Sequence, residues 1–272
     1  SIYQVEGNSG QALAPLLTIL IFIPLGQFGA IWFTVVAGIA ALLLVYVARW
    51  YKQKLAEEGA ARLRRGAGAR ETGMNISRKQ VKLGILLLVF LVFARSWFHA
   101  GISNYYHFYL MERYGVSLEH AQFFILLFMV AGVFGTFLGG PLSDRFGRRN
   151  MIWFSMLGAV PLAMLLPYVS LTWAYPVILL CGFIILSSFS VTVVYAQELV
   201  PGKIGTVSGL IIGFAFGMGA IGSLVLGFLA DLFGLRLVMI VCGFLPLLGL
   251  LTFLLPSDRM LRDQESASGT GE

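Results

Sequence analysis

The chain has 272 residues, of which 58% are apolar, 14% aromatic and only 12% charged, and its mean hydropathy is +0.85. Soluble domains carry about a quarter charged residues, so this composition excludes an ordinary soluble protein. Although the formal net charge is +6, the basic residues stand between apolar runs and not on one soluble surface, which argues against nucleic-acid binding.

Apolar runs of roughly 20 residues recur along the chain, and each is long enough to cross a hydrocarbon core of about 30 Å as a helix. The sequence therefore predicts an all-α membrane protein. We predict eight membrane spans, at residues 9–24, 30–49, 80–110, 118–142, 150–167, 173–197, 205–230 and 236–256. The two cysteines, Cys181 and Cys242, fall inside apolar segments, where structural thiols are expected.

A basic stretch at residues 51–79 separates the second span from the third. Its glycine and alanine content predicts a mobile linker with a short amphipathic helix at its start. The linker divides a first membrane segment, residues 1–50, from a second, residues 80–256. The Ser, Gly and Glu bias of residues 257–272 predicts a disordered tail. Because the chain starts at Ser1 close to an apolar run, we also expect it to be a fragment of a longer protein.

The distribution of lysine and arginine predicts the topology. Eight crossings put sixteen of the nineteen basic residues on the linker's side of the membrane, and only Arg113 and Arg236 on the other. The linker, the turn at 144–150 and the C-terminus are therefore expected in the cytoplasm. The remaining cation, Arg95, lies inside a span.

Glycine recurs every four residues in the seventh span, at Gly205, Gly209, Gly213 and Gly217. This spacing places the four on one helical face, where a second backbone can approach closely. The stripe could serve helix packing alone. In a transporter the same smooth face could also serve sliding or rocking.

The turn between the fourth and fifth spans reads "GGPLSDRFGRRN", residues 139–150. Gly139 and Gly140 suit a tight helix crossing, and Gly147 permits a positive φ in the turn. The Asp144 carboxylate can accept hydrogen bonds from a neighbouring helix N-terminus, and the arginines can anchor the turn at an anionic lipid surface. In sequence order, the residues that make up this pattern are Gly140, Leu142, Asp144, Arg145, Gly147, Arg148 and Arg149.

This pattern resembles the G-x-L-x-D-R-x-G-R-R/K signature of the major facilitator superfamily. The resemblance implies two bundles of six helices joined by a long cytoplasmic linker. Residues 1–50 would then be helices five and six of the N-terminal bundle, and residues 80–256 the complete C-terminal bundle. The missing N-terminal helices of the same transporter would be its partners. By the family's internal symmetry, Asp144 would contact the start of helix five, near residues 1–4, and act as a conformational switch.

Further strings extend the resemblance. Gly10, Ala14 and Pro15 in "GQALAPLL" resemble the G-x-x-x-G-P signature of the family's drug:proton antiporters, with Ala14 in place of the second glycine. The alternative is an ordinary proline-kinked helix. "SNYYHFYLMERYGVS" and "VYAQELVPGKIGTVSGLIIGFAFGMG" resemble family exporters of phosphonate antibiotics. This implies proton-driven efflux of a small anionic drug such as fosmidomycin across the bacterial inner membrane, with no cofactor, metal or enzymatic reaction.

Ionisable residues inside a span are functional candidates because burying them in a membrane is costly. Arg95 and His99 are four apart in "FARSWFHAGISNYYHFY", so they share a helix face, which Ser103 and Tyr106 continue outward. Arg95 could hold a phosphonate, and His99 could titrate near neutral pH and carry a proton. Alternatively, Arg95 pairs with a carbonyl or an acid for structure alone, and His99 is structural. His107 is a further candidate near the outer end of the helix.

Three functions remain open from the sequence. The first is a proton-driven exporter, the second is an uptake symporter for an organic anion or sugar, and the third is a non-transporting fragment with a structural role. The chain contains neither a G-x-x-x-x-G-K-[ST] phosphate loop nor an H-E-x-x-H metal helix, so an ATP-driven pump and a membrane metalloprotease have no support.

Overall fold

A computed structural model describes residues 2–64, 78–200 and 204–255. Within these ranges the regular structure is helical throughout and contains no strand. The chain therefore has the all-α membrane architecture that its composition predicts.

The structure has helices at all eight predicted membrane positions. Six are long and apolar enough to cross a bilayer by length and composition. Of the other two, Ser9–Leu25 is a shorter apolar helix, and α6 (Arg148–Leu165) begins with two arginines and an asparagine, which shortens its apolar part. The six are Thr34–Lys52, Val81–Tyr114, Leu118–Phe146, Leu171–Leu199, Gly205–Phe233 and Leu235–Leu254.

The chain forms two compact units, which are described separately. One comprises Leu17–Thr72, and the other comprises Ser1–Leu16 with Gly73–Glu272. This division has one boundary between Leu16 and Leu17, at the end of α1 (Ile2–Leu17), and a second between residues 72 and 73, inside the predicted linker. The assignment of residues 1–50 to an N-terminal bundle stays a prediction.

The smaller unit is dominated by one long helix. After the short segments η1 (Thr18–Phe22), α2 (Ile23–Leu25) and η2 (Gly26–Phe28), helix α3 runs over Gly29–Arg64. The start of the predicted linker is therefore a continuation of the second membrane helix. Residues 65–77 of that linker and the predicted tail at 257–272 lie outside the described residues.

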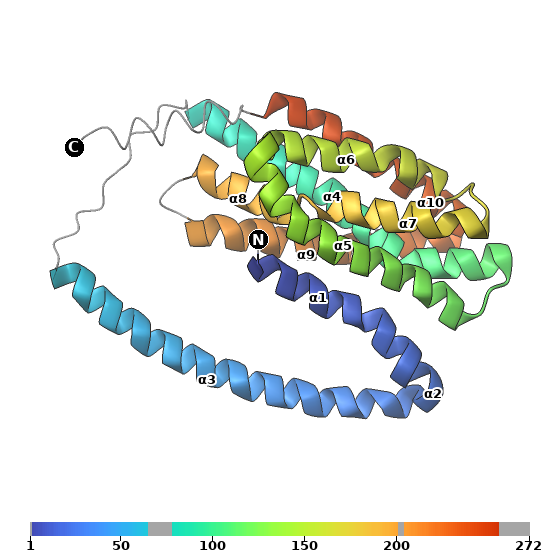
Figure 1. The fold of residues 1–272 in the computed structure, drawn as a ribbon, viewed down its shortest axis with the longest axis horizontal. Helices are drawn as coiled ribbons and strands as arrows, with labels where there is room; N and C mark the ends of the chain where they lie inside the picture. Colours follow the sequence, from blue (N-terminus) through green and yellow to red (C-terminus); the bar gives the residue numbers. More distant parts are fainter. Residues whose placement is uncertain (1, 65–77, 201–203, 256–272) are drawn as a thin grey trace. The chain divides into compact units, whose positions relative to one another are not determined.

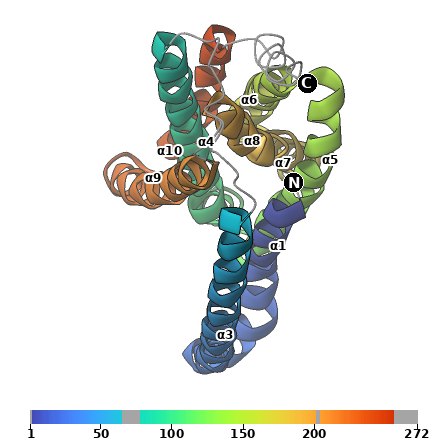
Figure 2. The same ribbon diagram turned by 90° about the vertical axis from the view of Figure 1, so that its left-hand side faces the viewer.

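The larger unit is a helical bundle (Figure 1). Figure 2 shows α4 and α8 between α9 on one side and α5 on the other. In chain order the elements of this bundle are α4 (Arg78–Tyr114), α5 (Leu118–Phe146), α6, α7 (Leu171–Leu186), α8 (Phe189–Leu199), α9 (Ile204–Phe233), α10 (Leu235–Phe244) and η3 (Leu245–Leu254).

Helices α5 and α7 cross with backbone against backbone. A Cβ atom added at Gly135 would meet the carbonyl of Phe183, and one added at Gly139 would meet the carbonyl of Ser187. From the other helix, a Cβ at Gly182 would meet the carbonyl of Phe128. The expected role of Gly139 in a tight crossing is therefore confirmed.

The sixth predicted span is interrupted between α7 and α8. Ser187 and Ser188 form the break, and Ser188 has φ −96° and ψ 2°. The Ser188 hydroxyl lies 2.6 Å from that of Ser155 on α6, and the Ser155 hydroxyl also donates to the Ile185 carbonyl at 3.2 Å. Serine side chains of this kind compete with the backbone for hydrogen bonds, which favours a break at this point.

The signature turn ties α6 to two other elements. Gly147 adopts the expected positive φ, 92°, between α5 and α6. Arg148 forms an ion pair with Glu198 near the end of α8. Arg149 donates hydrogen bonds to the carbonyls of Thr252 and Phe253 at the end of η3, at 3.2 and 2.6 Å. Asp144 is exposed, and because no side chain of residues 1–4 is described, its contact there stays a prediction.

The bundle core is continuous and apolar, and both cysteines belong to it. Cys181 and Cys242 are fully buried free thiols, as their positions in apolar segments predict. In contrast, large apolar side chains on the outer surface are exposed, among them Leu224, Phe228 and Trp173. Such a surface is suited to contact with lipid or with further helices.

Candidate functional site

A cavity of about 300 Å³ lies within the larger unit, along one face of α4. Helix α4 contributes most of the polar lining, α9 lies opposite, and α1 and the α7–α8 break supply the remaining walls. The polar residues that line it are Gln11, Arg95, Ser96, His99, Ser103, Asn104 and Ser223, and the apolar ones include Leu186, Phe189, Ala215 and Phe216.

Arg95 lies at one end of the cavity and is only 4% exposed. Its guanidinium stacks over the ring of Phe189, 4.4 Å from the ring centroid, and its Nη1 donates to the Ser188 hydroxyl at 3.5 Å. No carboxylate among the described residues pairs with it, and its buried Nη2 has no hydrogen-bond partner there. A buried cation left with unused donors is costly unless another acceptor reaches it.

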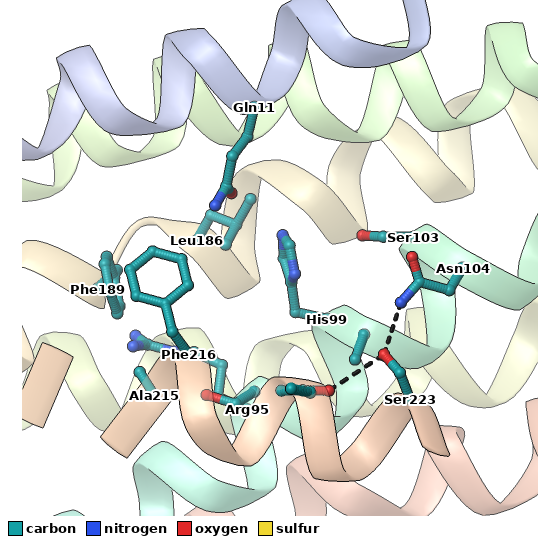
Figure 3. Close-up of a pocket in the computed structure, with 14 residues that line it drawn as sticks. Gln11, Arg95, His99, Ser103, Asn104, Leu186, Phe189, Ala215, Phe216 and Ser223 are labelled. Atoms are coloured by element: carbon teal, nitrogen blue, oxygen red, sulfur yellow. Dashed lines mark hydrogen bonds between the residues drawn. The ribbon is translucent and has the colours of Figure 1, made fainter. Parts of the chain in front are cut away.

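His99 and Ser103 continue from Arg95 along the same face of α4, as their spacing predicts. Figure 3 shows the His99 ring standing in the cavity between them, with the Gln11 side chain reaching down from α1. Neither ring nitrogen of His99 forms a hydrogen bond within the described part of the chain, and the ring lies 5.8 Å from that of Phe128. The Ser103 hydroxyl is buried and also has no hydrogen-bond partner there.

The far end of the cavity carries a small hydrogen-bonded group. Asn104 Nδ2 donates to the Ser223 hydroxyl at 2.7 Å, and that hydroxyl donates to the Gly219 carbonyl at 3.1 Å (Figure 3). Outside the cavity lining, Tyr105 donates to the Ser223 carbonyl at 2.5 Å. These bonds hold α4 to α9 and orient the Asn104 amide.

Tyr106 and His107 do not line this cavity, contrary to the expectation for Tyr106. Tyr106 is fully buried, with its ring 6.2 Å from Tyr109 and 6.4 Å from Phe124 of α5. Tyr106 continues the face of α4 that carries Arg95, His99 and Ser103. Beyond Ser103, however, α5 covers this face, so Tyr106 lies in the core and not in the cavity. His107 is 8% exposed and packs on the Phe108 ring at 4.0 Å.

Sequence reasoning missed several lining residues. Gln11 stands next to Gly10 in the antiporter-like motif, where a polar side chain within an apolar run was a usable signal. Pro15, which has no N–H, cannot donate to the Gln11 carbonyl one turn earlier, and the helix changes to a π-helix at Thr18. Asn104 and Ser223 lie on different helices, and nothing in their spacing predicts that they meet.

The glycine stripe of α9 is open in the described structure. A Cβ atom added at Gly205, Gly209, Gly213 or Gly217 would have no heavy atom within 4 Å among the described neighbours. These glycines therefore make no close helix contact within the described bundle.

Among the described residues, no group of three or more His, Cys, Asp or Glu side chains could hold a metal ion.

Comparisons with known proteins agree with this architecture. Residues 1–222 match the family described as Major Facilitator Superfamily. The chain is 53% identical over 266 residues to the "Uncharacterized MFS-type transporter YfnC" of Bacillus subtilis, covering 98% of this chain and 64% of that protein. It is 43% identical over 259 residues to the "Fosmidomycin resistance protein" of Escherichia coli, covering 95% of this chain and 62% of that protein. The chain thus spans less than two thirds of the length of these relatives.

Proposed function

Because this chain belongs to the major facilitator superfamily, whose members are transporters and not enzymes, we propose that the full-length protein exports small anionic drugs, driven by protons. The relative named for fosmidomycin resistance supports a phosphonate as the substrate. The chain is a multi-pass membrane protein. For its location we propose the bacterial inner membrane, with the linker and C-terminus in the cytoplasm, in keeping with the sixteen-to-two distribution of basic residues.

The observation that carries the proposal is the state of Arg95. Its guanidinium is buried and lines a cavity, and among the described residues it has no acidic partner and no hydrogen-bond partner for Nη2. A structural arginine would be expected to use its donors on carbonyls or carboxylates. A phosphonate in the cavity would supply the missing acceptors, because its oxygens match the planar donors of a guanidinium.

His99 is the proposed proton carrier. It lines the same cavity one helical turn from Arg95, and its ring nitrogens are free of hydrogen bonds to described residues. A proton on His99 and an anion at Arg95 would therefore influence each other through the shared cavity. The signature turn, with Asp144, Arg145 and the Arg148–Glu198 pair, would act as the cytoplasmic switch element.

The first test uses the full-length gene in an efflux-deficient bacterium. Fosmidomycin susceptibility is measured with and without a protonophore for the wild type, Arg95→Ala and Arg95→Lys. We expect protonophore-sensitive resistance that Arg95→Ala abolishes in protein that is still expressed and folded, with partial retention in Arg95→Lys because one charge remains. A wild type that confers no resistance would contradict fosmidomycin export.

The direction of flux separates this proposal from uptake. In energised inverted vesicles an exporter accumulates labelled fosmidomycin, whereas an uptake symporter for an organic anion or sugar does not. His99→Gln is expected to keep substrate binding and lose proton-driven accumulation. If neither vesicle orientation shows flux with the full-length protein, the remaining alternative is a non-transporting, structural role.

A further inference from the structure

We infer that a groove on the outside of the larger unit binds an anionic phospholipid, with the lipid phosphate at the signature turn and an acyl chain against aromatic side chains further along α6. The groove is formed by the last turns of α5, the first two turns of α6 and the end of η3. It shares no lining residue with the cavity along α4. The inference therefore depends neither on the substrate of the transporter nor on the direction of transport.

The groove has a volume of about 660 Å³ and two kinds of lining. Arg149 and Asn150, in the first turn of α6, supply its polar end. Exposed aromatic side chains form most of the rest, namely Phe146, Trp153, Phe154 and Phe253. The ring of Trp153 meets that of Phe253 edge-on, with the centroids 5.8 Å apart, which joins the α6 wall to the η3 wall.

Positive charge gathers at the polar end of the groove. Arg149 donates to two carbonyls at the end of η3, which fixes its guanidinium in place there. Asn150 Nδ2 donates to the Phe146 carbonyl at 3.0 Å and carries a second N–H, which can donate to a phosphate oxygen. The exposed Arg145 stacks over the Phe146 ring, 5.6 Å from its centroid, and so brings a second guanidinium to the same end.

The other groups of the turn leave this charge in place. Arg148 is already paired with Glu198, and Asp144 does not line the groove. Helix α6 also begins here, and Gly147, its N-cap residue, has no side chain to cap the first backbone N–H groups. Because the N-terminus of a helix favours anions, it adds to the attraction exerted by the two arginines.

The order of groups along the groove matches that of a phospholipid at the edge of the bilayer. Arg149 and Asn150 come first on α6, and Trp153 and Phe154 follow one turn further along the helix. Tryptophan is typical of the boundary between headgroups and hydrocarbon. Acyl chains would cover exposed rings at this depth whatever the headgroup. The arginines add the preference for an anionic headgroup, because basic pockets between membrane helices attract such lipids.

The test measures how strongly brominated lipids quench the fluorescence of Trp153. The full-length transporter is reconstituted into vesicles in which either phosphatidylglycerol or phosphatidylcholine carries the bromine atoms, and Trp153→Phe is measured in parallel. The difference between the wild type and this variant isolates the signal of Trp153, because bromine quenches only at short range. We expect phosphatidylglycerol to be favoured over phosphatidylcholine at least roughly fivefold, the effect of one arginine near an anionic lipid surface.

Charge variants test which residues give the preference. Arg145→Gln and Arg149→Gln should each lower it severalfold, because each removes one cation from the polar end. Arg149→Lys keeps the charge and should keep most of the preference, even if weaker bonds to η3 loosen that part of the bundle. Arg113→Gln is the matched control and should change nothing, because Arg113 is also exposed and stacked over an aromatic ring, but at the opposite end of the bundle.

The outcomes decide between a specific lipid site and its alternatives. Equal quenching by the two lipids, or a preference that survives both glutamine variants, would overturn the proposal. Excess glycerol 1-phosphate in solution should leave the quenching unchanged, and recovery of fluorescence would mean that the groove binds a free phosphate and not a lipid. A preference that falls in Arg145→Gln and Arg149→Gln but not in Arg113→Gln would support the site. None of these results depends on whether the transporter exports fosmidomycin.

Discussion

Replacing Gly139 by alanine tests the crossing of α5 and α7 most directly. The added Cβ would meet the Ser187 carbonyl, a backbone atom that cannot rotate aside as a flexible side chain would. Overpacking of this kind costs typically 1–3 kcal/mol, and the severity of the contact places it near the upper limit, about 3 kcal/mol. Alanine recovers about 1 kcal/mol of helix propensity, so the expected net loss is about 2 kcal/mol.

The assay is thermal unfolding of the full-length transporter in detergent, with Gly158→Ala as the control. A Cβ at Gly158 on α6 would find its nearest neighbour, Ile184 Cγ2, at 3.4 Å, so that variant should be neutral or slightly stabilised. For a bundle of this size we expect Gly139→Ala to lower the Tm by roughly 4–8 °C. Equal stability of the two variants would refute the inferred backbone contact.

Because Ser187 adjoins Ser188, the hydrogen-bond partner of Arg95, Gly139→Ala should also weaken phosphonate binding.

Three further predictions concern the signature turn and α9. In a double-mutant cycle, Arg148→Ala and Glu198→Ala should couple by about 0.5–1 kcal/mol, since the ion pair is partly exposed; additive effects would contradict its formation in solution. Gly147→Ala should destabilise the protein by about 1–2 kcal/mol in a denaturation experiment, because φ is 92° there, and an unchanged Tm would argue against that conformation. Gly213→Leu should leave the Tm of this chain unchanged, because the glycine stripe is open here. In the full-length transporter the same change should reduce transport, because the stripe would meet helices outside this chain; full activity in vesicles would exclude that contact.

Much of the fold follows from local signals in the sequence. Apolar run length predicts the positions of the helices, and the need for a positive φ predicts Gly147 as the turn residue. A spacing of four residues correctly places Arg95, His99 and Ser103 along one cavity wall. Each of these features depends on the helix or turn to which the residue itself belongs.

The features that the sequence did not predict depend on contacts between helices. Tyr106 shares the periodicity of Arg95, but α5 covers it, and periodicity carries no information about which neighbour covers a face. Asn104 and Ser223 are 119 residues apart and meet only because α4 packs on α9. The break at Ser187 and Ser188 lies inside an apolar run that is long enough to read as one continuous helix.

The burial of both cysteines has a practical consequence for site-specific labelling of the protein. Cys181 and Cys242 are enclosed in the bundle core, so thiol-reactive spin labels or fluorophores should react poorly with either in folded protein. A cysteine introduced at an exposed site such as Tyr168 would then be labelled selectively without removing the native pair. Within this chain, the two native cysteines therefore leave a nearly silent background for spectroscopic measurements with introduced labels.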